Sequence, residues 1–223
     1  MTLNRLSDHI AAQGFVDAAL PPELDRVDGF EDCAWLLSSN VANHFAARLM
    51  LSEAAHLYGT VRRFEGTPRV VEIGRYRGGT TLLLAAAGGN VLSIDIDEQL
   101  RESDESLRSA LSRLGLEGRA ELIIDDSSTF PVEAGSVDIL FIDGDHRYEG
   151  ASRDVAHWLP GLRRGGLLLL HDGKFPEPSR PWNRPPDAEV RGVQRLAEEL
   201  ERRSELEKMT APGTLAQFRH TSS

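Results

Sequence analysis

The sequence predicts an α/β fold, a Rossmann-like seven-stranded mostly parallel sheet with helices on both faces, an antiparallel C-terminal strand and additional N-terminal helices. Two observations predict it. Short apolar runs alternate with helix-like segments, as is typical of a parallel sheet covered on both faces. Each of five apolar runs also ends in a carboxylate or a carboxylate–histidine pair. Ligands of such sheets bind beyond the carboxyl ends of the strands, so these acids indicate a binding site.

The composition excludes several classes of protein. With 223 residues, 40% hydrophobic and 27% charged, the chain can form one core without disulfide or metal support. A net charge of −10 and a pI near 5.2 argue against nucleic-acid and anionic-membrane partners. The single cysteine, Cys33, excludes an intrachain disulfide. Because we find no signal-peptide pattern and no apolar run long enough to span a bilayer, we expect a cytoplasmic protein.

The sequence predicts two parts. Residues 1–66 are expected to form a helical cap or interface segment, and residues 67–223 are expected to form the main, ligand-binding domain. The helices of the first segment could cover a sheet edge, roof a site or pair with a second copy, and their sequence does not decide between these roles. We expect a homo-oligomer. Apolar residues recur near helical spacing over residues 3–20, Glu31–Met50 and Ser52–Phe64.

The main domain continues in a regular order of strands and helices. The segment Gly173–Ala188 holds five of the eleven prolines and Trp182, and predicts either a substrate lid or a packed surface loop. The other expected elements are a strand from Val70, a helix at Thr80–Ala87, a strand at Asn90–Ile96, a helix at Glu98–Leu114, strands at Ala120–Ile124 and Ser136–Ile142, a helix at Ala151–Leu162, a turn at Arg163–Gly166, a strand at Leu167–Leu170, a helix at Glu189–Arg203 and a hairpin over Leu206–His220.

The stretch Val70–Thr81, VVEIGRYRGGTT, predicts a buried strand, a tight turn and the start of a helix. Its glycines allow a ligand to approach the backbone closely, and the helix start supplies unpaired N–H groups. The spacing is E-x-G-x-x-x-G, and Arg75 replaces the second glycine of a dinucleotide fingerprint. Glu72 would repel a phosphate but suits an ammonium group, so the pattern indicates an aminoacyl nucleoside.

This pattern resembles the first motif of the class I S-adenosylmethionine-dependent methyltransferases. With FIDGDHRYEG (Phe141–Gly150) and the later His-Asp pair, it resembles the subfamily of macrolide and aminocoumarin sugar O-methyltransferases and cephalosporin-hydroxylase-like proteins. The resemblance covers about residues 52–172 and the TLAQFRH tail. It implies S-adenosylmethionine as cofactor, held by Glu72, Gly74, Arg75, Tyr76, Gly78, Thr80, Asp95, Ile96, Asp126, Ser127 and Asp143.

The strand-end acids are expected to divide the cofactor between them. Glu72 should face its methionine portion, directly or through water. Asp95 stands at the end of the second strand, where a carboxylate accepts hydrogen bonds from both ribose hydroxyls, with Ile96 beside the adenine. Asp126 and Ser127 should meet the adenine edge.

Metal-dependent members of the resembled group hold Mg²⁺ at positions that correspond to Asp143, His171 and Asp172. His171 departs from their all-carboxylate pattern, so the site either shifts to a softer divalent ion or has no metal, with His171 capping the strand or hydrogen-bonding substrate. The resemblance also implies that Asp145 is the catalytic base. His146 is the alternative base, because histidine titrates near neutrality, or it pins the loop.

The sequence therefore predicts an enzyme, an O-methyltransferase that acts on a hydroxyl of a small molecule. A sugar on a natural product or a catechol-like diol is the expected acceptor, with assistance from magnesium or another divalent metal. The alternative is a non-methylating accessory or assembly protein that keeps the cofactor pocket. Arg75 disfavours a third class, the nicotinamide-dependent oxidoreductases.

Overall fold

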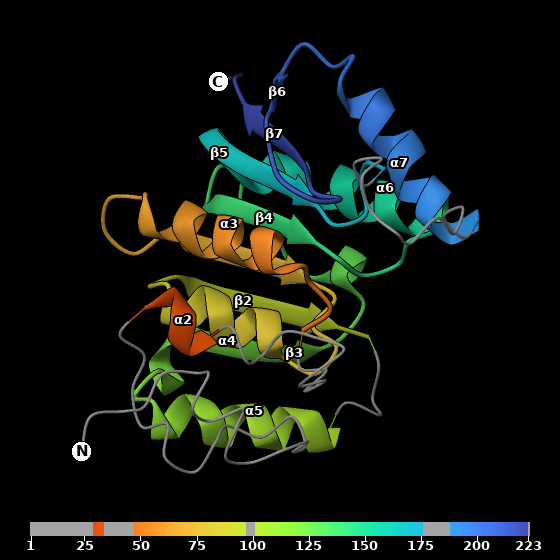
Figure 1. Cartoon of the computed structure of the whole chain (residues 1–223). Coiled ribbons are helices and arrows are strands. Elements are labelled where there is room, and N and C mark those ends of the chain that lie inside the picture. The colour runs from red at the N-terminus through yellow and green to blue at the C-terminus, as the bar shows by residue number, and fades with distance from the viewer. Residues whose placement is uncertain (1–28, 34–46, 97–100, 176–187, 223) are drawn as a thin grey trace.

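The structure, a computed structural model, describes residues 29–33, 47–96, 101–175 and 188–222. The helix predicted over residues 3–20 lies outside this part of the chain, as does Trp182 with most of the proline-rich loop. One sheet of seven strands has the order β3-β2-β1-β4-β5-β7-β6 (Figure 1). Strands β1 to β5 pair in parallel, and β7 is antiparallel to both β5 and β6. The predicted fold class is confirmed.

The elements follow the expected alternation closely. The strands are β1 (Arg69–Ile73), β2 (Asn90–Asp95), β3 (Ala120–Ile124), β4 (Val137–Ile142), β5 (Leu162–Leu170), β6 (Leu206–Met209) and β7 (Ala216–His220). The helices are α2 (Phe30–Cys33), α3 (Leu51–Arg62), α4 (Gly79–Ala86), α5 (Arg101–Arg113), α6 (Tyr148–Trp158) and α7 (Ala188–Leu200).

Alternate residues of the strands face two separate hydrophobic cores, because successive side chains of a strand point to opposite faces. Val70 and Phe141 pack with α3, α4 and α5 on one face of the sheet. Val71 and Leu140 pack with α6 and α7 on the other face (Figure 1). Helix α3 therefore shares its core with the sheet, although it precedes the predicted domain boundary at residue 67. In the described part of the chain, every helix is too short or too polar to cross a membrane.

Two predicted elements have different bounds in the structure. Residues 47–50, the end of the helix predicted over Glu31–Met50, are not helical, and Met50 instead precedes the first turn of α3. Strand β5 begins at Leu162 and includes the predicted turn Arg163–Gly166. Its pairing with β4 shifts there, since a bulge accommodates the extra residues and Gly165 takes a φ of +78°.

Candidate functional site

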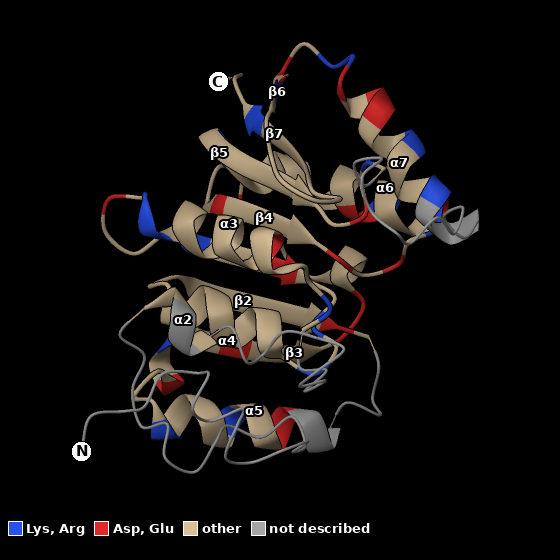
Figure 2. Cartoon of the chain, viewed as in Figure 1, with Lys and Arg blue, Asp and Glu red and all other residues tan. Residues whose placement is uncertain are grey.

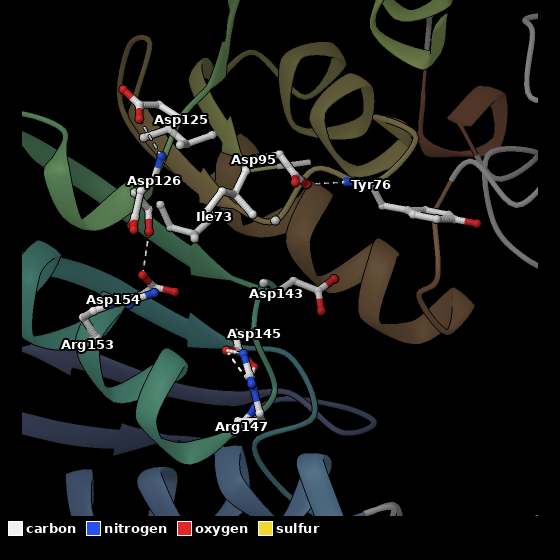
Figure 3. Close-up of a pocket in the computed structure, with 15 residues that line it drawn as sticks. Ile73, Tyr76, Asp95, Asp125, Asp126, Asp143, Asp145, Arg147, Arg153 and Asp154 are labelled. Carbon is white, nitrogen blue, oxygen red and sulfur yellow. Dashed lines mark hydrogen bonds and ion pairs between the residues drawn. The ribbon is translucent and has the colours of Figure 1, made fainter. Parts of the chain in front are cut away.

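A cavity of about 480 Å³ lies beyond the carboxyl ends of β1 to β4 and is bounded on one side by α6 (Figure 3). Acidic segments follow the arrowheads of β2 and β4 at this edge (Figure 2). The cavity therefore forms where the sequence predicts a ligand. It is lined by Ile73, Gly74, Tyr76, Ile94, Asp95, Ile96, Asp125, Asp126, Ser127, Asp143, Gly144, Asp145, Arg147, Arg153 and Asp154.

The loop after β1 passes directly against the loop after β4. Gly74 has a φ of +89°, and a Cβ atom there would overlap the main-chain carbonyl of Asp143. Only glycine satisfies both conditions. The sequence predicts close approach to the backbone at Gly74, and in the structure the main chain of Asp143 makes that approach. Tyr76 also has a positive φ, 50°, which is unusual for a residue with a side chain.

Asp95 fixes the shape of that loop. Its Oδ2 atom accepts hydrogen bonds from the main-chain N–H of Arg75 at 2.7 Å and from that of Tyr76 at 3.0 Å (Figure 3). The carboxylate thereby lies at the cavity wall at the end of β2, beside Ile96. The predicted positions of Asp95, Ile96 and Tyr76 in one site agree with this arrangement.

Arg75 is not among the residues that line the cavity, and its predicted place among the cofactor-binding residues stays a prediction. Its buried guanidinium donates to both oxygens of Asp104 at 2.8 Å and to the carbonyls of Ser93 and Ile123. The side chain thus ties α5 to β2 and β3 from beneath the loop. Only the main-chain N–H of Arg75 contacts a site residue, Asp95.

Glu72 also lies away from the cavity. Its side chain is fully buried, and its Oε2 atom accepts hydrogen bonds from the hydroxyls of Thr81 and Ser93 at 2.5 Å. Its Oε1 atom has no partner in the described residues. Burial raises the pKa of Glu72 to about 7, against the opposing effect of these hydroxyls. Glu72 therefore has a place in the core, and its expected contact with the methionine portion of a cofactor, directly or through water, stays a prediction.

Two further predicted residues, Gly78 and Thr80, belong to the packing of α4 and not to the cavity wall. A Cβ atom on Gly78 would overlap the side chain of Leu107, so this glycine lets α5 pack closely. Thr80 is buried in the first turn of α4. A conformational or packing requirement therefore acts on both residues, and their expected contact with the cofactor stays a prediction.

The far end of the cavity is built by the loop after β3. Asp126 accepts hydrogen bonds from the N–H and the hydroxyl of Ser128, which lower the pKa of its carboxyl. The hydroxyl of Ser127 donates to Asp154 at 2.5 Å, and the indole N–H of Trp158 donates to the carbonyl of Ser127. The predicted pair Asp126 and Ser127 is therefore held in place by α6.

The Asp-Gly-Asp loop after β4 sends its two acids to different partners. Asp145 accepts hydrogen bonds from Arg147, including 2.7 Å from Nη2, and this contact lowers the pKa of the Asp145 carboxyl. A Cβ atom on Gly150 would overlap Asp145, which explains the glycine in the first turn of α6. Asp143 instead turns towards two histidines.

A second group of side chains, which we call the imidazole–carboxylate cluster, adjoins the cavity at Asp143. Asp143 Oδ1 lies 2.9 Å from His171 Nδ1 and 3.3 Å from His146 Nε2. Asp172 Oδ2 lies 3.7 Å from Nδ1 of each histidine. The other nitrogen of His171, Nε2, lies 3.4 Å from Glu53 Oε2. The cluster consists of Glu53, Asp143, His146, His171 and Asp172.

The charges within the cluster stabilise one another. Burial opposes ionisation of Asp143, but His171 and His146 outweigh it and lower the pKa of Asp143 to about 2. The hydrogen bond that His146 donates to the Asp143 carboxylate raises the pKa of His146. Burial opposes protonation of His171, but Asp143 and Glu53 outweigh it and hold the pKa of His171 well above its ordinary value. The ionised carboxyl of Asp143 and the protonated forms of His146 and His171 therefore favour one another.

Glu53 is the member of the cluster that the sequence does not identify. It comes from the first turn of α3, is fully buried, and accepts hydrogen bonds from the N–H groups of Met50 and Thr214 at 2.8 and 2.6 Å. Within the sequence it reads as an ordinary acid at a helix start. Its partner Thr214 is 161 residues away, so no local pattern predicts the contact.

Other residues of the cavity also escape sequence reasoning. Arg153 and Asp154 lie in the second turn of α6, and only the packing of that helix against the β3 loop brings them to the wall. Asp125, by contrast, directly follows β3 and could be found from the same strand-end pattern as Asp126.

Comparison with known proteins shows similarity to methyltransferases, both in sequence and in structure. A family model described as a methyltransferase domain matches residues 71–173. The structure is similar to that of an O-methyltransferase from Streptomyces achromogenes involved in tomaymycin synthesis, solved with S-adenosylmethionine, at a TM-score of 0.58 and 19% identity over 90% of this chain and 93% of the other.

Two further solved structures are similar at low sequence identity. One is an O-methyltransferase from Bacillus cereus in complex with S-adenosylhomocysteine, with a TM-score of 0.56 and 19% identity over 78% of this chain and 83% of that one. The other is an S-adenosylhomocysteine-bound methyltransferase from Podospora anserina, with a TM-score of 0.60 and 15% identity over 80% and 82%. The Rossmann-like fold of class I methyltransferases, expected from the sequence, is confirmed.

Proposed function

We propose that this chain is an S-adenosylmethionine-dependent O-methyltransferase that acts on a hydroxyl of a small molecule. One observation carries the proposal: Gly74, Asp95, Asp126 and Asp143 converge on a single cavity. Its volume of about 480 Å³ lies within the range of small-molecule sites. Neighbours of the same fold have been solved with S-adenosylmethionine or S-adenosylhomocysteine.

The cavity offers a distinct place for each part of the cofactor. Asp95 presents a carboxylate at the wall, which suits the vicinal hydroxyls of a ribose as hydrogen-bond donors. The loop of Asp126 and Ser127 then receives the adenine, with Ile96 against its face. This orientation directs the sulfonium end towards Asp143 and Asp145, where the acceptor must approach.

Methyl transfer requires little beyond alignment and removal of one proton. The acceptor oxygen forms a bond to the methyl carbon while the bond between that carbon and sulfur breaks. The electron pair of the broken bond stays on sulfur, which becomes a neutral thioether. The hydroxyl proton passes to a base. Asp145 and His146 are the candidate bases. Asp145 lines the cavity, and His146 belongs to the imidazole–carboxylate cluster that adjoins the cavity at Asp143.

A divalent metal is part of this proposal, because the residues that the sequence implied for one are together in the structure. His171 Nδ1 lies 2.9 Å from Asp143 Oδ1 and 3.7 Å from Asp172 Oδ2, and carboxylate oxygens and imidazole nitrogens are common ligands of divalent ions. A bound ion would lower the pKa of coordinated hydroxyls and orient them. An acceptor with two vicinal hydroxyls, such as a sugar of a natural product or a catechol-like diol, suits that arrangement.

The net charge of −10 supports a small-molecule acceptor over a nucleic-acid or anionic-membrane partner. The homo-oligomer expected from the sequence remains a prediction, which sedimentation of the purified chain can check.

Calorimetric titration with S-adenosylmethionine and S-adenosylhomocysteine tests the first step, and we expect saturable binding of both. Mass spectrometry of diol and sugar acceptors tests the second, through a mass gain of one CH₂ group. No binding of either nucleoside would overturn the proposal. Binding without transfer to any acceptor would instead favour a non-methylating accessory protein.

A further inference from the structure

We propose that Arg48, Tyr76 and Arg77 form an anion-binding site beside the cavity, and that this site holds a carboxylate of the acceptor. The inference rests on the proposed function and deepens it, because it names a chemical class for the acceptor, a hydroxyl-bearing molecule that also carries a carboxylate. Binding of such a molecule can be measured without methyl transfer, so the two proposals can fail separately.

Two guanidinium groups lie against one aromatic ring of the cavity wall. The guanidinium carbon of Arg48 is 4.8 Å from the centre of the Tyr76 ring, and that of Arg77 is 5.5 Å from it. Nη2 of Arg48 also lies 3.5 Å from the Tyr76 hydroxyl. Tyr76 itself lines the cavity. The ring therefore gathers two positive charges beside a cavity whose wall is rich in aspartates.

The backbone that carries these side chains is held in place. Asp95 accepts a hydrogen bond from the main-chain N–H of Tyr76, which has a positive φ of 50°. Arg48 stands between Ala47 and Leu49, and both of these belong to the core on the α3 and α4 face of the sheet. A guanidinium that rests on an aromatic ring is already oriented, so it loses less freedom when a ligand binds.

The positive charges of both guanidiniums are available to a ligand. Among the described residues, neither forms an ion pair with a carboxylate, whereas Arg75 pairs with Asp104 and Arg147 with Asp145. Both side chains are exposed to solvent. A guanidinium can donate two parallel N–H groups to the two oxygens of one carboxylate. In a chain with a net charge of −10, this pair of cations offers an acidic molecule a local attraction.

The position of the ring favours the acceptor over the cofactor as the source of the carboxylate. The Tyr76 ring extends to the same side of the cavity as the Asp143 carboxylate (Figure 3), where the acceptor is proposed to approach. S-Adenosylmethionine carries a sulfonium and an ammonium besides its carboxylate. Its net charge is therefore positive, and two guanidiniums would repel it. An acceptor with a carboxylate and hydroxyls carries no such positive charge.

The neighbouring acids favour a singly charged anion. Asp95 lies at the base of the Tyr76 loop, and Asp143 faces the same side of the cavity. A phosphate monoester carries a charge of about −1.5 to −2 at pH 7, so these two aspartates repel it more strongly than a carboxylate. The site therefore suits a carboxylate better than a phosphate, although arginine binds both groups.

Calorimetric titration of the full chain with matched acidic and neutral molecules tests this inference. Protocatechuate is catechol with an added carboxylate, and glucuronate is the acid that corresponds to glucose. We expect at least one acid to bind about tenfold or more tightly than its neutral counterpart, since hydrogen bonds to charged groups are strong. Added salt should reduce this preference.

The double change Arg48→Gln and Arg77→Gln should abolish the preference for the acid. Because both side chains are exposed, neither change should disturb folding. Arg62→Gln is the matched control and should retain the preference. It removes the same charge from an exposed arginine in the last turn of α3, at the opposite end of that helix from Arg48.

Equal affinity for acid and neutral molecule in both pairs, no binding of any of the four, or a preference that persists in the double variant would each overturn the inference. An equal loss of preference in Arg62→Gln would do so too, because it would indicate a general effect of charge.

Titration with S-adenosylmethionine separates the two proposals. If the double variant binds this cofactor about tenfold less tightly than the wild type, the arginines hold the cofactor's own carboxylate, which contradicts this inference alone. A wild type that prefers the acids but does not bind the cofactor contradicts the proposed function alone.

Discussion

The carboxyl edge of the sheet holds its acids in two different ways. In the β1–β3 half, Asp95 accepts main-chain N–H groups and Asp126 accepts the N–H and hydroxyl of Ser128. In the β4–β5 half, imidazoles surround Asp143. Main-chain and hydroxyl donors keep their protons and leave a permanent anion. Imidazoles can exchange protons for an ion. The same residue type at a strand end thus serves two kinds of chemistry, depending on its neighbours.

The largest effect should come from breaking the support under the β1–β3 half. Arg75→Ala leaves Asp104 buried without its ion pair, which should destabilise the chain by about 3–5 kcal/mol in chemical denaturation. Arg219→Ala, which removes an exposed pair with Glu207, should cost less than about 1 kcal/mol. Equal effects of the two changes would show that Arg75 does not support the loop through its buried contacts.

Glu72 should make the same half sensitive to pH. Its pKa of about 7 in the folded chain exceeds the ordinary 4.5, so the folded state binds more protons than the unfolded state between these values. The free energy of unfolding should therefore fall as pH rises from about 4.5 to about 7, by on the order of 3 kcal/mol.

Thermal unfolding of wild type and Glu72→Gln across this pH range measures that contribution. The variant cannot ionise at this position, so its stability should change less over the same interval. An unchanged slope would assign the pH dependence to other groups.

Asp95→Ala should separate the two halves. Loss of a charged hydrogen-bond acceptor should cost about 1.5–3 kcal/mol, which is about 10- to 150-fold in affinity for S-adenosylmethionine by calorimetry. The affinity of the imidazole–carboxylate cluster for a divalent ion should stay within about twofold, because the main-chain groups that donate hydrogen bonds to Asp95, those of Arg75 and Tyr76, belong to the loop after β1. A parallel loss of both affinities would mean that the halves are coupled.

The smallest effect is expected at Asp126. Asp126→Ala removes hydrogen bonds to Ser128, each worth about 1 kcal/mol net, and the residue is only partly buried. Cofactor affinity should fall by no more than about tenfold. Asp126→Asn retains an oxygen acceptor and should restore most of it. A larger loss in Asp126→Ala that Asp126→Asn does not restore would indicate direct contact between the carboxylate and the adenine.

The fold is readable from the sequence because its central strands are buried on both faces and appear as continuous apolar runs. The start of β5 is not readable, since Arg163–Gly166 has the polar, glycine-rich composition of a turn and yet continues the strand through a bulge. The predicted helix ending at Met50 fails at its last residues because they form the entry to α3.

The site is predictable only where position along a strand decides it. Asp95 ends β2, Asp126 lies two residues after β3 and Asp143 directly follows β4, and all three reach the cavity. Glu72 and Arg75 belong to the same motif, but their side chains point into the interior, and the spacing of a motif does not give that direction. Glu53 depends on contacts between segments far apart in the chain, which no local pattern records.

The anchoring of Glu53 by Thr214 also limits how this protein can be recombined. Both residues lie outside the stretch 71–173 that matches the methyltransferase-domain model, and yet Glu53 contacts His171 while Thr214 anchors Glu53. A chimaera that transplants only that stretch would inherit the residues that line the cavity but would lose the contact of Glu53 with His171. The exchangeable unit therefore runs at least from α3 to β7.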